Sequence, residues 1–317
     1  METRRIGSLQ VSIVGLGCNN FGWNIDYDKT SRVVDAALDR GINFFDTADI
    51  YGNTQSEEFL GRLLGSRRDR VVIATKFGAR MDDERRGARP EYIGRAAEDS
   101  LRRLGTDRID LYYLHQPDPE VPIADTLGAL DDLVTAGKVR EIACSNFTAE
   151  MLRAAHDTAR GRARFTAVQN EYSLLHRDPE CEVIPECERL DIAFVPYFPL
   201  ASGLLTGKYR RGRPAPEGSR IAAGGYFAGL LTDQKLDTVE SLRSFAESNG
   251  HTLLELAISW LLARPAVASV IAGATSPQQV AANGAAGGWR LTDSDIAAVD
   301  AVVPAPDAVA RVSRVRG

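Results

Sequence analysis

The sequence has few of the residues that mark several protein classes. It contains 4 cysteines in 317 residues, at positions 18, 144, 181 and 187, and none belongs to a Cys-x-x-Cys pair. This spacing argues against a disulfide-stapled secreted scaffold, and a reducing cytoplasm is the expected setting. The 4 histidines show neither His-Glu-x-x-His nor Cys/His ligand spacing, so we expect no metal site.

Long apolar runs and an excess of positive charge are also missing. The most apolar stretch, 253–274, carries Glu255 and is broken by Arg264 and Pro265, which predicts a buried helix, a turn and a buried strand. The chain has 38 Lys and Arg against 43 Asp and Glu, a net charge of −5. Nucleic acid and membrane are therefore not expected partners, and the pattern leaves the oligomeric state open.

Short apolar runs alternate with amphipathic helical patterns along the chain. Eight runs read as buried strands, at 13–16, 42–45, 71–75, 109–114, 139–144, 166–169, 192–196 and 268–271. Helical patterns include 30–40, 56–64, 90–104, 123–135 and 148–160, with Thr30, Ser56 and Thr148 as expected capping residues. Continuous apolar strands between helices predict a parallel sheet covered on both faces.

A closed barrel fits this alternation better than an open, doubly wound sheet. No linker divides the chain, and eight βα units of ~30–40 residues suit closure, so we expect one (β/α)8 TIM-barrel domain over 1–317. The glycines after the first strand lack Gly-x-Gly-x-x-Gly spacing and open no helix. The expected additions are an N-terminal β-hairpin at 4–14, a long loop at 201–225, and extra helices at 232–248 and 292–303.

Four polar residues follow three neighbouring strands. Asp46 and Tyr51 come after the second strand, Lys76 after the third and His115 after the fourth. The carboxyl ends of barrel strands converge on one mouth, so these side chains should face one another. Alternatively, Asp46 or Asp49 could cap a turn.

This set of residues suits proton donation to a carbonyl group. A tyrosine has an ordinary pKa of ~10, and a nearby ammonium such as that of Lys76 lowers it. Asp46 can hold Lys76 in place, while a neutral His115 can orient the substrate oxygen. Reduction of a carbonyl also needs a hydride that no side chain supplies, which implies a nicotinamide cofactor.

On these residues the sequence resembles the aldo-keto reductases over essentially the whole chain. Residues 41–52 look like the family's second-strand signature, and Thr75-Lys76 and Leu114-His115 match its lysine and histidine. The resemblance implies a (β/α)8 barrel in which Tyr51 is the general acid/base, Lys76 and Asp46 tune it and His115 orients the carbonyl. It also implies NADP(H), with NAD(H) possible.

The same resemblance implies a cofactor site that extends across the barrel mouth. Its members, in chain order, are Gly17, Cys18, Asn19 and Asp46 near the ribose, Ser145, Asn146 and Gln169 at the carboxamide, Tyr197, Phe198, Pro199 and Leu200 at the nicotinamide ring, Ser202, Gly203 and Lys208 over the pyrophosphate, and Gly273, Thr275, Gln279 and Asn283 at the adenosine end.

The adenosine end departs from part of that family. Many members have Lys and Arg at the positions of Gly273 and Gln279, and loss of these cations would weaken a 2′-phosphate site. Potassium-channel β-subunit-like members use an arginine from the long loop instead, and Arg220 stands at a comparable place. The hypothesis is that Arg220, Thr275 and Gln279 hold the 2′-phosphate.

Three functions are compatible with these residues. The first is an NADP(H)-dependent reductase of aldehydes or ketones, with Trp23, Tyr51 and His115 at the substrate; Trp23 could equally be an aromatic at the core edge. The second is a cofactor-binding sensor or regulatory subunit with slow turnover. The third is a barrel aldolase that uses Lys76 as a Schiff-base nucleophile.

Overall fold

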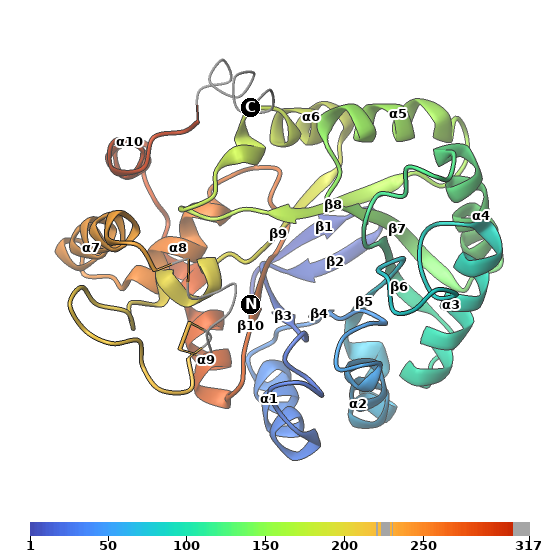
Figure 1. Ribbon diagram of the computed structural model, residues 1–317, viewed down its shortest axis with the longest axis horizontal. Coiled ribbons are helices and arrows are strands. Elements are labelled where there is room, and N and C mark those ends of the chain that lie inside the picture. Colours follow the sequence, from blue (N-terminus) through green and yellow to red (C-terminus); the bar gives the residue numbers. More distant parts are fainter. Residues whose placement is uncertain (220, 223–228, 230, 307–317) are drawn as a thin grey trace.

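Eight parallel strands form a single sheet that curls into a barrel (Figure 1). The computed structural model describes residues 1–219, 221–222, 229 and 231–306. The strands are β3 (Val14–Gly17), β4 (Phe44–Asp46), β5 (Val72–Phe77), β6 (Ile109–Leu114), β7 (Val139–Ser145), β8 (Phe165–Glu171), β9 (Ala193–Tyr197) and β10 (Val270–Gly273). They lie in the order β10-β3-β4-β5-β6-β7-β8-β9, and Phe194 of β9 pairs with Val267, just before β10, which brings the two edges together. The predicted (β/α)8 barrel is confirmed.

Helices surround the barrel (Figure 1). The α-helices are α1 (Tyr27–Asp39), α2 (Gln55–Leu64), α3 (Pro90–Leu104), α4 (Ile123–Thr135), α5 (Ala149–Ala159), α6 (Val183–Leu190), α7 (Asp233–Ser248), α8 (Leu253–Leu262), α9 (Pro277–Ala285) and α10 (Asp293–Val302). Short 3-10 helices are η1 (Gly65–Arg70), η2 (Asp178–Glu180), η3 (Ala201–Thr206) and η5 (Ala286–Gly288). The two extra helices expected near the C-terminus are α7 and α10. No helix in the described part of the chain is long and apolar enough to cross a membrane.

Two of the three expected capping residues are wrong. Asp26, not Thr30, caps α1 by accepting a hydrogen bond of 2.9 Å from the backbone N–H of Lys29. Thr54 precedes α2, and the Ser56 hydroxyl is turned inward instead of capping the helix. Thr148 does cap α5. A hydroxyl at a helix start is equally useful for a buried contact, and the sequence pattern does not distinguish the two uses.

The N-terminal hairpin packs against residues inside the barrel. Strands β1 (Thr3–Ile6) and β2 (Leu9–Ser12) pair antiparallel around Gly7, whose φ of 54° is the left-handed region that favours glycine. Ile6 and Leu9 join Phe44 and other inward-facing barrel residues in one apolar cluster. Next to the hairpin, Asn43 at the start of β4 accepts from the backbone N–H of Ser12 at 2.7 Å. The hairpin therefore covers the amino-terminal end of the strands and leaves the carboxyl end for function.

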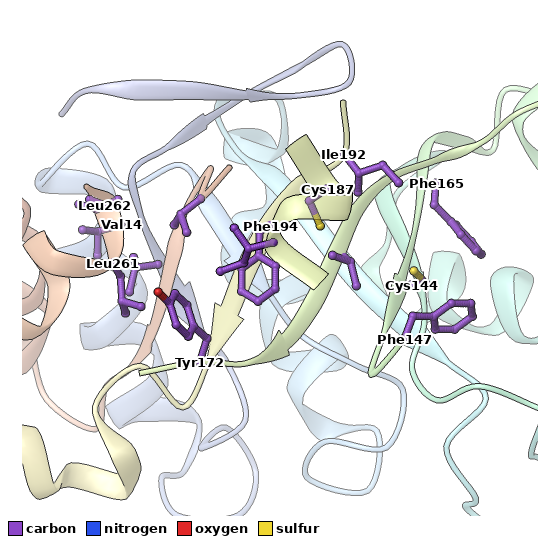
Figure 2. Packing of buried hydrophobic residues seen from close by; sticks show 14 of the residues in the cluster. Val14, Cys144, Phe147, Phe165, Tyr172, Cys187, Ile192, Phe194, Leu261 and Leu262 are labelled. Atoms are coloured by element: carbon purple, nitrogen blue, oxygen red, sulfur yellow. The ribbon is translucent and has the colours of Figure 1, made fainter. Parts of the chain in front are cut away.

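The outer core fills the layer between the strands and the helices. Figure 2 shows Phe194 and Tyr172 packed there with Leu261 of α8. The Tyr172 and Phe194 ring centroids lie 5.7 Å apart in an edge-to-face arrangement, and Tyr172 lies 5.3 Å from Trp260. These aromatic contacts hold the loop after β8 against α8.

Asp110 joins three elements at the amino-terminal end of the barrel. Its carboxylate is 1% exposed, and Oδ2 accepts from the backbone N–H of Ile73 at 2.9 Å and forms a salt bridge with Arg68 at 2.7 Å. Oδ1 accepts from Arg140 at 3.0 Å. Because these donors come from β5, η1 and β7, one buried carboxylate fixes the relative positions of three neighbouring segments.

We expect Asp110→Ala to lower the free energy of unfolding by about 3–5 kcal/mol, because it leaves a buried N–H and two guanidinium groups without their acceptor. Urea-induced unfolding measures the change. The control is Asp107→Ala, which removes a side chain that is 88% exposed and pairs with Arg108 at 3.4 Å. It should change stability by less than about 0.5 kcal/mol. Equal effects of the two substitutions would contradict this assignment.

Candidate active site

A buried ion pair lies at the carboxyl end of β4 and β5. The Lys76 side chain is fully buried, and its Nζ donates to Asp46 Oδ1 at 2.5 Å and to the carbonyl oxygen of Thr47 at 2.8 Å. Strand pairing sets Asp46 beside Ala74, two residues before Lys76, so adjacent strands bring the two charges together. A paired ammonium in such a place is a fixed positive charge close to the barrel mouth.

Tyr51 lies directly over this ammonium. Lys76 Nζ is 5.1 Å from the centroid of the Tyr51 ring. The loop that carries Tyr51 is held by backbone bonds from Thr47 to Ala74 and from Asp49 to Lys76. The predicted meeting of the tyrosine, lysine and aspartate is therefore present in the structure.

The tyrosine loop touches the loop after β3 at Gly52. Its φ is 60°, and a Cβ at this position would lie 2.4 Å from the carbonyl oxygen of Phe21 and 3.0 Å from the Cα of Gly22. Only glycine allows the two backbones to approach so closely. Ser56 adds a second link, because its hydroxyl donates to the carbonyl oxygen of Cys18 at 3.0 Å.

The electrostatics of Tyr51 correct one expectation. The sequence predicts a net lowering of the tyrosine pKa by Lys76, but burial outweighs that effect and the pKa of Tyr51 lies above its ordinary value. Lys76 lowers it and the negative charge of Asp46 raises it further. Burial also disfavours the charged form of Lys76, yet Asp46 and Tyr51 hold the pKa of this lysine above its ordinary value. Lys76 is therefore a stable cation and a poor amine nucleophile, which argues against the Schiff-base alternative.

His115 faces Tyr51 from the end of β6. The two rings are 5.9 Å apart and nearly perpendicular, and the backbone N–H of His115 donates to the carbonyl oxygen of Phe77 at 2.8 Å. Burial, with a smaller contribution from Lys76, lowers the pKa of His115 to about 3. The imidazole is neutral at physiological pH, as the sequence argument requires, and can donate one hydrogen bond without competing for the proton of Tyr51.

Trp23 stands at the same mouth. Its side chain is 58% exposed, and its ring lies 6.1 Å from that of Tyr51. This exposure does not fit the core-edge alternative. Asn20, which sequence reasoning missed, organises this loop: its backbone carbonyl oxygen accepts from three N–H groups, and its side chain accepts from Asn24 at 2.8 Å. An asparagine shortly after a strand is the one sequence signal for that role.

Three residues expected at a carboxamide lie beside Asp46 and His115. Ser145 Oγ donates to the carbonyl oxygen of Gln169 at 2.7 Å, and Gln169 Nε2 donates to Asp46 Oδ2 at 2.9 Å. Asn146 donates to the carbonyl oxygen of His115 at 3.1 Å and accepts from the Tyr197 hydroxyl at 2.9 Å. The ends of β7, β8 and β9 thus form one polar surface beside Tyr51, and amide and hydroxyl groups of this kind fit a nicotinamide carboxamide.

The other expected cofactor residues lie in two places. At the β3 and β10 ends, Gly17 pairs with both Asp46 and Gly273, and Cys18 and Asn19 follow it. Close by, Gln279 accepts from the backbone N–H of Thr275 at 2.7 Å, and Asn283 donates to the carbonyl oxygen of Gly273.

The second group follows β9. Phe198 and Ser202 have φ of 51° and 58°, so the chain turns sharply after Tyr197 through Pro199 and Leu200 into η3. The Lys208 ammonium would lie 3.1 Å from a Cβ placed on Gly203, so these two residues are neighbours. Arg220 lies outside the described residues. Within those residues, no group of three or more His, Cys, Asp and Glu side chains could hold a metal ion.

A second buried polar cluster lies behind Tyr51, and sequence reasoning did not find it. Glu57 of α2 is fully buried and accepts from Thr75 at 2.5 Å and from Arg103 of α3 at 2.6 Å. Asp49 is 2% exposed beside Tyr92, and its Oδ1 has no hydrogen-bond partner among the described residues. Burial and the charge of Glu57 raise the pKa of Asp49 to about 7.

This raised pKa predicts a pH-dependent stability. Between the ordinary pKa of an aspartate and about 7, the folded chain holds a proton on Asp49 that the unfolded chain releases, so its stability falls as the pH rises through that range. We expect Asp49→Asn, which mimics the neutral acid, to remove this part of the decline and to raise the melting temperature at pH 8 by several degrees. Thermal unfolding at pH 5 and pH 8 tests it. The exposed Asp83→Asn should not change the slope; if Asp49→Asn does not change it either, the neutral-acid assignment is wrong.

A parallel (β/α)8 barrel with a tyrosine, a buried Lys–Asp pair and a neutral histidine at its mouth has the groups for proton exchange with a carbonyl or alcohol oxygen. The profile of the Aldo/keto reductase family matches residues 13–304, and the chain belongs to this family. The protein is accordingly an oxidoreductase of small carbonyl substrates, in a family that generally uses nicotinamide cofactors.

Curated relatives agree with this membership. The chain is 34% identical over 306 residues to "Probable aldo-keto reductase 1" of Glycine max, covering 94% of this chain and 87% of that protein. It is 35% identical over 296 residues to "Aldo-keto reductase YhdN" of Bacillus subtilis, covering 90% and 88%. A "Probable voltage-gated potassium channel subunit beta" of Arabidopsis thaliana is 33% identical over 296 residues, covering 89% and 90%.

Proposed function

We propose that the protein is an NADP(H)-dependent reductase that converts an aldehyde or ketone to an alcohol. The observation that carries the proposal is the contact of Tyr51 with a buried ammonium that Asp46 holds in place. A lysine with only a structural role at a strand end would extend to solvent. The Lys76 ammonium is instead buried, and it lies against the ring of Tyr51 at the barrel mouth.

The residues divide the chemistry among them. A nicotinamide cofactor, when bound, would supply the hydride that the carbonyl carbon needs. Tyr51 gives its phenol proton to the carbonyl oxygen, and Lys76 stabilises the tyrosinate that remains until solvent returns the proton. Neutral His115 donates a hydrogen bond that orients the oxygen, and Trp23 borders the substrate on the open side. The alcohol thus forms by addition of one hydride to the carbonyl carbon and one proton to the carbonyl oxygen.

The chain's own polar groups define where the cofactor is held in this proposal. Ser145, Asn146 and Gln169 would hold the carboxamide, and Tyr197 the nicotinamide ring. Gly17–Asn19 would hold the ribose, the loop 202–208 the pyrophosphate, and α9 the adenosine end. This arrangement follows the polar strand ends from β7 to β10.

Tyr51→Phe tests the acid role. The substitution keeps the ring over Lys76 and removes only the transferable proton, so we expect turnover with an aldehyde panel to fall by about 10³-fold while the NADPH dissociation constant changes less than about 3-fold. Trp23→Phe is the matched aromatic control and should alter KM for the substrate more than turnover. Retained turnover in Tyr51→Phe would refute the mechanism.

Measurement of wild-type turnover also tests the regulatory-subunit alternative, which the plant potassium-channel subunit among the relatives brings into view. Tight NADPH binding with turnover of the whole aldehyde and ketone panel near the uncatalysed rate would favour a sensor over a reductase. The complete set of Asp46, Tyr51, Lys76 and His115 supports the reductase.

Cofactor preference depends on Arg220 in this proposal, together with Thr275 and Gln279. A guanidinium binds a phosphate through charge-assisted hydrogen bonds, so Arg220→Ala should weaken NADPH by about 10-fold or more and leave NADH nearly unchanged. Fluorescence titration with each nucleotide measures both constants. Arg213→Ala removes the same charge from the same loop and should affect the two nucleotides little. Equal losses for NADPH and NADH in Arg220→Ala would count against the 2′-phosphate role.

A further inference from the structure

Gln169 bonds to the catalytic aspartate. Its Nε2 donates to Asp46 Oδ2 at 2.9 Å, and both side chains are 3% exposed. A carboxylate only accepts, so the amide must turn its NH2 group toward Asp46. The carbonyl oxygen of the same amide is then the atom with which Gln169 can accept a hydrogen bond from a nicotinamide carboxamide.

The two oxygens of Asp46 have different partners. Oδ1 accepts from Lys76 at 2.5 Å, while Oδ2 accepts from Gln169. Gln169 therefore fixes the rotation of the carboxylate about its terminal bond. A carboxylate whose two oxygens are both held keeps one oxygen aimed at the ammonium, and the ammonium in turn keeps its place 5.1 Å from the centroid of the Tyr51 ring.

Few other groups lie close enough to orient the Asp46 carboxylate. The ring of Tyr113 lies 5.7 Å from Lys76 Nζ, on β6, and its hydroxyl lies beside Gln169. The other titratable groups that face the set are Cys18 at the end of β3 and His115 at the end of β6. His115 is neutral, and burial raises the pKa of the Cys18 thiol well above its ordinary value, so the thiol is uncharged as well and neither group brings a further charge to Asp46.

We propose that Gln169 is a positioning residue for proton transfer: it orients Asp46, through it Lys76, and so links the cofactor carboxamide to the acid strength of Tyr51. The inference rests on the proposed function for the identity of the cofactor. The chain of contacts itself runs from β8 to β4, β5 and the tyrosine loop, and protein side chains alone make it. Loss of Gln169 should therefore raise the pKa of Tyr51 even in the cofactor-free protein.

The first test is an NMR titration of the cofactor-free protein labelled with 13C at Cζ of its 9 tyrosines, in which Tyr51→Phe identifies the Tyr51 signal. In Gln169→Met the Tyr51 midpoint should move to higher pH by about one unit. Gln169→Asn keeps an amide but is one methylene shorter, so it serves as a second variant and should shift the midpoint in the same direction. The control is Asn170→Ser, which loses a 2.8 Å bond to the carbonyl oxygen of Phe147 but does not touch Asp46, and it should leave the midpoint unchanged.

A second test asks whether the effect passes through Asp46. In an Asp46→Asn background, Gln169→Met should add no further shift to the Tyr51 midpoint, because the element that transmits the effect is already altered. An additional shift of the same size would overturn the proposal. So would an unchanged Tyr51 midpoint in both Gln169 variants accompanied only by a weaker NADPH dissociation constant, which is the result expected of a residue that binds the cofactor and nothing else.

Activity completes the experiment and separates the two proposals. At saturating NADPH, turnover of Gln169→Met should fall about 10-fold, and in alcohol oxidation the rising limb of the pH profile should move upward with the Tyr51 midpoint. If wild-type protein lacks nicotinamide-dependent turnover while the cofactor-free Tyr51 shift is present, the proposed function fails and the positioning role of Gln169 stands. If wild-type protein is active and the Tyr51 shift is absent, the positioning role of Gln169 fails and the proposed function stands.

Discussion

The bond between the Lys76 ammonium and the Asp46 carboxylate is the interaction on which the rest of the site depends. A fully buried cation is costly unless a carboxylate and further acceptors meet it, and Asp46 and the carbonyl oxygen of Thr47 do so. Because this pair fixes a charge at the barrel mouth, Tyr51 only has to be placed above it. The backbone bonds from the tyrosine loop to β5 provide that placement. The buried ion pair, the tyrosine loop and the strand pairing thus position one another.

The contacts that stabilise the fold and the titratable groups of the candidate site lie at opposite ends of the barrel. The hairpin and the Asp110 cluster occupy the amino-terminal end of the strands, where they bind neighbouring segments together. Three groups with perturbed pKa values, Tyr51, Lys76 and His115, gather at the opposite end. This division allows polar groups to be strained or unpaired at the mouth while the other end supplies stability.

Sequence reasoning predicted the barrel and the meeting of the four polar residues at its mouth because both depend on short patterns. Alternating apolar runs fix strand number, and parallel strand ends bring Asp46, Lys76 and His115 together whatever lies between them. It missed Asn20, Glu57 and Arg103 and gave Asp49 only as a turn cap, since a polar residue within a helix or turn has the same appearance whether it faces solvent or a buried partner. It also misjudged the net shift of Tyr51, because burial has no signature in local sequence.

The contact between Gly52 and the backbone of Phe21 and Gly22 has a consequence for how this protein could diversify. The two loops at the mouth cannot move apart or thicken at that point without disturbing both. Trp23, whose backbone belongs to one of them, nevertheless projects a largely exposed side chain. Substrate range can therefore change by exchange of single side chains at the rim, while insertions and deletions in the same loops would disrupt Tyr51. Natural variation at this mouth should accordingly favour substitution over changes in loop length.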